Sequence, residues 1–189
     1  MKNLRFGERK SPPRSNVWFD EEIGVLQILL SKEDIGLSDE DIELSGKVFQ
    51  SKKEVHITII GRDLGQRLKQ AMGKDDSIKN HLREIINRTD WTYEVKSRLY
   101  YLSKDKRVDT EPGIIHAESI IVEVDLAGIR RFYENLSKML RTDLDVPPTH
   151  ITLYTRGDPL GIALNSRADF EQFVIGKVVP GELKTKFSG

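Results

Sequence analysis

The sequence predicts an α+β fold in which helices cover the faces of a sheet, and two hydrophobic periodicities predict it. Residues 91–102 alternate between apolar and polar side chains, which is typical of a strand with one buried face. Residues 129–140 carry apolar side chains three and four positions apart, which is typical of a helix. The coarse order of the patterns is strand, helix, helix, strand, strand, helix, strand, helix, and such an order favours an α+β protein.

The secondary structure of the first third of the chain is the hardest to predict from the sequence. Residues 25–30 suit a buried strand or a short helix, and the acidic run 34–43 suits a solvated loop or helix. Residues 48–50 and 55–60 flank Ser51-Lys52-Lys53, which predicts a hairpin. The other expected elements are helices over 63–72 and 77–88, strands over 91–102 and 114–124, a helix over 129–140, a strand over 149–155, a helix from Ser166 and a strand near Val178.

Two aspartates are expected to cap helices. Asp63 is followed three residues later by Gln66, as in a capping box, and Gly73 suits the end of that helix. Asp125 is expected to cap the helix with the clearest apolar stripe.

Length and amino-acid composition restrict the classes of protein to which the chain can belong. The 189 residues suit one domain, with a flexible lead-in over residues 1–16 and a single domain over 17–189. The 30 basic and 30 acidic side chains balance, so net charge indicates no partner. The absence of cysteine excludes a disulfide scaffold, a cysteine nucleophile and a zinc–thiolate site. No secretory or membrane-spanning segment is visible, so we expect a cytoplasmic protein that binds no membrane.

One short pattern occurs twice, 94 residues apart. Its copies are His56-Ile-Thr58-Ile and His150-Ile-Thr152-Leu, each within a predicted strand. Because residues i and i+2 of a strand point to the same side, each strand presents an imidazole and a hydroxyl on one face and aliphatic side chains on the other. The repeat is consistent with a diverged internal duplication.

Two imidazoles and two hydroxyls suit the cleavage of a phosphodiester. Imidazole titrates near neutral pH, so one histidine can accept a proton from water while the other donates one to the departing oxygen. Threonine hydroxyls can donate to the non-bridging oxygens, where negative charge must be held. The scheme requires no metal, and two histidines without a recurring acidic residue make a zinc site improbable.

The paired motif resembles that of the 2H phosphoesterases, which are named for two His-aliphatic-Thr/Ser-aliphatic motifs. The resemblance spans roughly residues 47–179, and Pro147-Pro148 before the second motif is also similar to the family. It implies two pseudo-symmetric lobes with antiparallel sheets, helices on the outer faces and a central groove. It also implies that His56 and His150 are the catalytic acid and base, and that Thr58 and Thr152 bind phosphate.

Several residues near the motifs are candidates for substrate binding. Tyr154 and Arg156 lie an even number of residues after His150, so a regular strand would place them on the same face as His150. Arg156 is expected to reach a phosphate or ribose, and Tyr154 is expected to stack on a base. Arg98 and Tyr100, on the polar side of the strand over 91–102, are possible substrate contacts if that side lines the groove. Structural or surface roles are favoured for Lys52, Lys53, His81 and His116, with a place along the groove as the alternative for His116.

The resemblance implies a hydrolase that acts on phosphoric diester bonds. Its expected substrate is RNA with a cyclic phosphate end, or a small 2′,3′-cyclic nucleotide, and the expected state is a monomer without a cofactor or metal. The alternative is a non-catalytic nucleotide- or RNA-binding module, although binding alone needs no acid–base pair. An RNA-end ligase is a weaker third hypothesis because no lysine nucleotidyl-transfer motif is visible.

Overall fold

A computed structural model describes residues 4–107 and 113–185 of the chain and contains one large antiparallel sheet with five α-helices in these ranges. The strands are β1 (Arg9–Lys10), β2 (Val17–Asp20), β3 (Val25–Leu30), β4 (Ile42–Leu44), β5 (Lys47–Ser51), β6 (Val55–Ile60), β7 (Tyr93–Arg107), β8 (Ile114–Leu126), β9 (His150–Arg156), β10 (Val174–Val178) and β11 (Lys184–Thr185). The helices are α1 (Lys32–Ile35), α2 (Arg62–Met72), α3 (Asp76–Arg88), α4 (Ile129–Leu140) and α5 (Arg167–Phe173), with short 3₁₀ turns at Arg14–Asn16 and Pro180–Glu182. The predicted combination of strands and helices is therefore confirmed.

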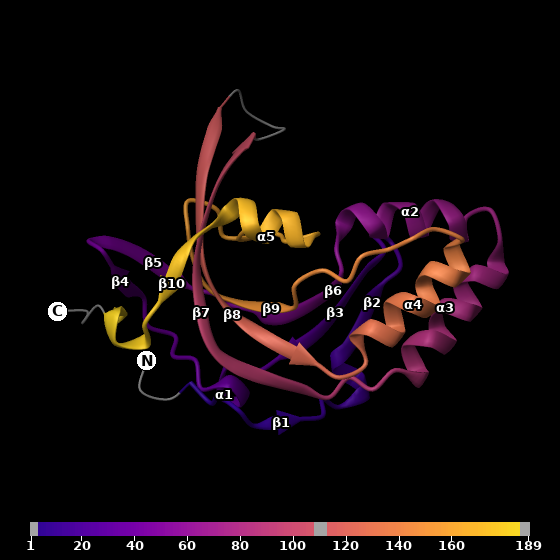
Figure 1. The fold of residues 1–189 in the computed structure, drawn as a ribbon, viewed down its shortest axis with the longest axis horizontal. Helices are drawn as coiled ribbons and strands as arrows, with labels where there is room; N and C mark the ends of the chain where they lie inside the picture. Colours follow the sequence, from indigo (N-terminus) through magenta and orange to yellow (C-terminus); the bar gives the residue numbers. More distant parts are fainter. Residues whose placement is uncertain (1–3, 108–112, 186–189) are drawn as a thin grey trace.

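The middle of the sheet runs in the order β2, β3, β6, β9, β8, β7, and all of these neighbours are antiparallel. Beyond β7 lie β1 and β10, while β5 continues alongside β9 and leads to β4 and β11. Figure 1 shows β7 and β8 as a long curved ribbon that extends past α5. The two strands that carry the repeated motif, β6 and β9, are therefore direct neighbours in the sheet.

The two faces of the sheet are covered differently. Helices α2, α3 and α4 supply Leu68, Leu82 and Phe132 to a large apolar cluster that includes Ile57 and Ile151 of the central strands. Helix α5 packs on the opposite face in a smaller cluster that contains Tyr100, Ile121 and Phe173. Figure 1 shows α5 over β9 and apart from α3 and α4. No helix among the described residues is both long and apolar enough to cross a membrane.

The predicted hairpin over residues 48–60 is wrong. Strands β5 and β6 both pair with β9, through Ser51 opposite Tyr154 and Ile57 opposite Ile151. The backbone N–H of Lys52 donates to the Leu153 carbonyl at 3.0 Å. Residues 52–54 therefore form an interruption within one long pairing and do not reverse the chain.

Both predicted aspartate caps are also wrong. Helix α2 follows Gly61 without a side-chain cap, and the Asp63 carboxylate instead accepts from the Asn165 amide at 2.8 Å. Asp125 still belongs to β8, opposite Glu94, and α4 begins only after Gly128. By contrast, Ser166 does cap α5 by accepting from the Asp169 N–H at 3.0 Å.

The start of the chain departs from the expected flexible lead-in. Arg9 and Lys10 form β1 against β7, and Leu4 and Phe6 pack against the large apolar cluster. The first three residues lie outside the described ranges. From Leu4 onward the segment is therefore part of the fold.

A contact between two glycine backbones fixes α2 against the turn before β3. Gly24 has φ 73°, and a Cβ added there would lie 2.3 Å from the Gly65 carbonyl oxygen. We expect Gly24→Ala to lower the free energy of unfolding by about 1–3 kcal/mol, because both the positive φ and the clash oppose a side chain. Urea unfolding measures this loss. Gly46→Ala is the matched control, since Gly46 has φ 76° but open space around it, and equal losses in the two variants would contradict the role of the contact.

Candidate functional site

The four motif side chains lie on one face of the sheet, and their aliphatic neighbours lie on the other. The half-buried set is His56, Thr58, His150 and Thr152. The fully buried set is Ile57, Ile59, Ile151 and Leu153. The predicted alternation within each motif is therefore confirmed, and we call the side of the sheet that carries His56 and His150 the motif face.

The register of β6 and β9 brings the two motifs together. Ile57 lies opposite Ile151 in this antiparallel pair. One step either way along the pair places His56 beside Thr152 and Thr58 beside His150. Directly opposite Cβ atoms lie about 4.5–5.5 Å apart, and diagonal neighbours such as the two histidines are about 7–8 Å apart, with their Cβ atoms somewhat closer. The register therefore places the two histidines diagonally across the strand pair, each beside the threonine of the other motif.

The tautomer of His150 is set by a backbone contact. Its Nδ1 lies 2.9 Å from the Pro148 carbonyl oxygen, which can only accept a hydrogen bond. Nδ1 therefore carries the proton, and in the neutral ring Nε2 holds a free lone pair. Burial lowers the pKa of His150 despite this hydrogen bond, which favours the neutral ring. Neutral His150 is consequently suited to act as a base.

His56 is in a more positive environment. Burial first, then the nearby Lys52 ammonium and His150, lower the pKa of His56, while Glu54 acts in the opposite direction. The Lys52 ammonium is half-buried and donates to the Pro159 carbonyl at 2.7 Å, which anchors it to the segment that follows β9. A bound anionic phosphate would offset this positive charge and favour protonated His56.

Lys52 is a site residue for which the sequence favours only ordinary surface charge. Its placement depends on the backbone contact between residue 52 and Leu153 of β9, which joins segments about one hundred residues apart. Sequence periodicity carries no information on such a contact. The neighbouring Lys53 remains exposed, as expected.

Replacing Lys52 by methionine should raise the pKa of His56, because removal of a nearby positive charge favours the imidazolium. The pKa is measured by following the imidazole NMR signals against pH, with the His56 signal assigned from the spectrum of His56→Ala. Lys53→Met is the matched control and should leave the titration of His56 unchanged. Coincident titration curves for the wild type and Lys52→Met would contradict the electrostatic contact.

Neighbouring strands add further groups to the motif face. On β3, Gln27 lies opposite Thr58 and Leu29 lies opposite His56. On β8, Glu123 lies opposite His150. The predicted candidate Arg98 reaches this end of the site, but its guanidinium is held by both Glu123 oxygens at 2.7 Å.

Tyr100 is also on the motif face but is not free to contact a substrate. It lies opposite Ile121, and its ring packs edge-on against Phe170 of α5 with centroids 4.9 Å apart. Only 9% of Tyr100 is exposed. Its role in the structure is to anchor α5 on the sheet.

The expectation that Tyr154 and Arg156 share the face of His150 is wrong. Ile120 pairs with Tyr154 but Ile121 pairs with Thr152, so β9 contains one extra residue, Leu153, at this point. Such a bulge reverses the alternation of side chains beyond it. Tyr154 is therefore fully buried in the large apolar cluster, away from the motif face.

Arg156 lies on the same side as Tyr154 and binds a buried carboxylate. Glu118 is fully buried and is contacted by Arg156, by the Tyr101 hydroxyl and by the Lys47 ammonium. Burial raises the pKa of Glu118, but the hydrogen bonds from Lys47, Tyr101 and Arg156 outweigh it and lower the pKa to about 2. This ion cluster is therefore a structural feature on the opposite side from His56 and His150.

The other two histidines lie apart from the motif face. His116 is exposed on β8, with Nδ1 2.7 Å from Asp105, on the side that carries Glu118. His81 is exposed on α3. Both positions agree with the structural or surface roles favoured from the sequence.

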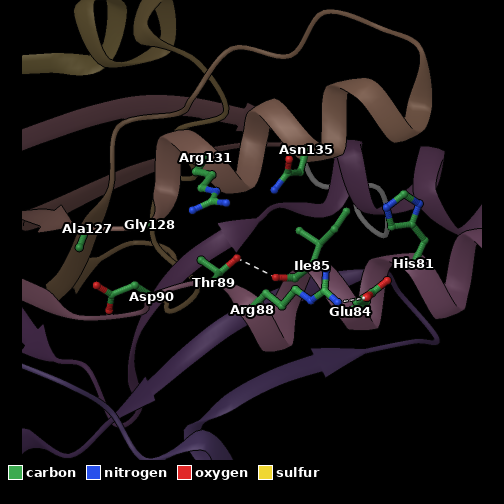
Figure 2. Close-up of a pocket in the computed structure, with 10 residues that line it drawn as sticks. All are labelled: His81, Glu84, Ile85, Arg88, Thr89, Asp90, Ala127, Gly128, Arg131 and Asn135. Atoms are coloured by element: carbon green, nitrogen blue, oxygen red, sulfur yellow. Dashed lines mark hydrogen bonds and ion pairs between the residues drawn. The ribbon is translucent and has the colours of Figure 1, made fainter.

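A cavity of about 470 Å³ lies between α3 and α4 and contains no motif residue. Figure 2 shows Arg131 and Asn135 of α4 facing α3, where Arg88 pairs with Glu84 at 2.5 Å. Within residues 4–107 and 113–185, no group of three or more histidine, aspartate or glutamate side chains is arranged to hold a metal ion. The polar groups that the motif face carries include the imidazoles and hydroxyls of the two motifs, the Gln27 amide and the Arg98–Glu123 ion pair.

Comparison with known proteins gives no relative: no family model, no curated protein and no solved structure matches this chain.

Proposed function

We propose that this protein is a metal-independent phosphodiesterase of the 2H type that hydrolyses a 2′,3′-cyclic phosphate, or a related phosphodiester, of RNA or a nucleotide. The observation that carries the proposal is the crossed arrangement on β6 and β9, in which each histidine lies beside the threonine of the other motif. Two imidazoles on either side of one phosphate can act as base and acid in a single displacement.

In the proposed reaction, Nε2 of His150 removes a proton from water as the water oxygen forms a bond to phosphorus. The bond between phosphorus and one ribose oxygen breaks, and protonated His56 donates its proton to that oxygen. The hydroxyls of Thr58 and Thr152 donate to the non-bridging oxygens, and the Lys52 ammonium lowers the cost of their negative charge. The hydrogen bond from His150 to Pro148 supports its assignment as the base.

The equivalent placement of the two motifs supports a duplicated origin of the two halves. Any antiparallel pair has a local twofold rotation, and here the pairing of Ile57 with Ile151 makes that rotation exchange one His-Ile-Thr motif with the other. We propose on this basis that the chain contains two related lobes that meet at a central groove on the motif face. In this proposal the two halves differ in the other groups that they place on the motif face, such as the paired Arg98 and Glu123.

Hydrolysis of 2′,3′-cyclic AMP in the presence of EDTA tests the proposal. We expect turnover by the wild type without added metal, and a single product isomer that identifies which ribose oxygen leaves. Binding of the product without turnover of cyclic nucleotides or of RNA with cyclic phosphate ends would replace this proposal with a nucleotide-binding module.

A further inference from the structure

The sheet carries an exposed tryptophan on the motif face. Trp18 of β2 lies opposite Gln27 of β3, which in turn lies opposite Thr58 of β6. Its neighbours Val17 and Phe19 point to the other side and pack against the large apolar cluster. The indole is therefore on the same side of the sheet as both histidines.

The pairings place Trp18 at one end of a row that crosses the strands. From Trp18 the row passes through Gln27, Thr58 and His150 and ends at Glu123. Neighbouring strands lie about 4.8 Å apart, so the Cα atoms of Trp18 and Thr58, two strands apart, are separated by about 10 Å. A side chain and one nucleoside together span this distance.

Two large apolar side chains are exposed near the Trp18 end of the row. Trp18 is 45% exposed, and Leu29, diagonal to it across β2 and β3 and directly beside His56, is 39% exposed. Single exposed apolar residues are common on protein surfaces, and what distinguishes these two is their position in line with the motif histidine and threonine across the strands. At the opposite end of the row, the Arg98 guanidinium is already paired with Glu123. The exposed aromatic side chain of the row is therefore at its β2 end.

We propose that Trp18, with Leu29 beside it, is the platform on which the nucleobase of the substrate stacks while its phosphate lies between His56 and His150. The inference rests on the proposed function and specifies its substrate class as a phosphodiester that carries a base, in preference to a small phosphodiester without one. Because every base has a π-face, such a platform contributes affinity with little sequence preference. Trp18 is thus a specificity residue with no part in proton transfer.

Calorimetric titration with adenosine 3′-monophosphate and with inorganic phosphate tests the platform without reference to turnover. Trp18→Ala should weaken binding of the nucleotide by about 5- to 150-fold, the range expected for one base–aromatic stack. Binding of inorganic phosphate should be unchanged, and Trp18→Phe should restore most of the nucleotide affinity. Ile175→Ala is the control, since Ile175 is a 64% exposed apolar residue on β10.

Kinetics separate this inference from the proposed reaction. Trp18→Ala should lower kcat/KM for 2′,3′-cyclic AMP by a similar factor and leave it unchanged for glycerol 1,2-cyclic phosphate, which has no base. Equal losses for both substrates, or nucleotide affinity equal to that of the wild type, would overturn the platform. Wild-type binding that depends on Trp18 without any turnover would overturn the phosphodiesterase and retain the platform. Turnover of the glycerol compound without affinity for nucleotide would do the reverse.

Discussion

Replacement of His56 or His150 by alanine is expected to lower kcat/KM for 2′,3′-cyclic AMP by about 10²–10⁴-fold each, the usual contribution of a positioned acid or base. The effect is large because, in the proposed reaction, each of the two half-buried imidazoles moves a proton and neither of the chain's other two histidines lies on the motif face to replace it. The double variant should lose little more than either single variant, since acid and base act in one step. Initial rates in EDTA measure the loss.

Two controls make the histidine result interpretable. His81→Ala changes an exposed histidine on α3 and should retain wild-type activity. Circular dichroism melting curves should show that His56→Ala and His150→Ala remain folded. If both folded variants kept more than about a tenth of the wild-type rate, well above the range that loss of an acid or base produces, the two-histidine mechanism would be wrong.

Replacement of Glu118 by glutamine is expected to lower the free energy of unfolding at pH 7 by roughly 3 kcal/mol. The folded pKa of Glu118 is about 2, below its ordinary 4.5. The ionised carboxylate therefore stabilises the fold above the ordinary pKa, and this stabilisation is lost as the pH falls from about 4.5 to about 2. Urea unfolding at several pH values should show a steeper acid-side loss in the wild type than in Glu118→Gln.

An exposed ion pair is the matched control for Glu118. Glu171 pairs with Arg167 at 3.1 Å, and its side chain is 67% exposed. Glu171→Gln should cost less than about 1 kcal/mol, because water screens such a pair. Similar losses for Glu118→Gln and Glu171→Gln at pH 7 would show that Lys47 and Arg156 do not stabilise the buried carboxylate.

The sequence alone predicts how the side chains are arranged within each motif. A strand period of two predicts that His56 and Thr58 share a face, and that His150 and Thr152 do the same. It does not predict which strands are neighbours, because pairing depends on contacts between residues far apart in the chain. That β6 and β9 are adjacent, with Ile57 opposite Ile151, is known only from the structure.

Cross-strand pairing explains two places where the structure differs from the expectation. The extra residue at Leu153 reverses the alternation, so Tyr154 enters the core and Arg156 reaches Glu118. Asp125 has the chemistry of a cap but remains paired with Glu94 as part of β8. Local propensity does not include these cross-strand pairings.

The crossed register also determines which substitutions are energetically coupled. Since His56 lies beside Thr152, and His150 beside Thr58, each half of the proposed phosphate site would be built from both copies of the repeat. In a double-mutant cycle, His56 should therefore couple more strongly to Thr152 than to Thr58, its neighbour in sequence. If that coupling is found, neither copy of the motif is a functional unit by itself, and sequence change in one copy is constrained by the residue across the strand pair in the other.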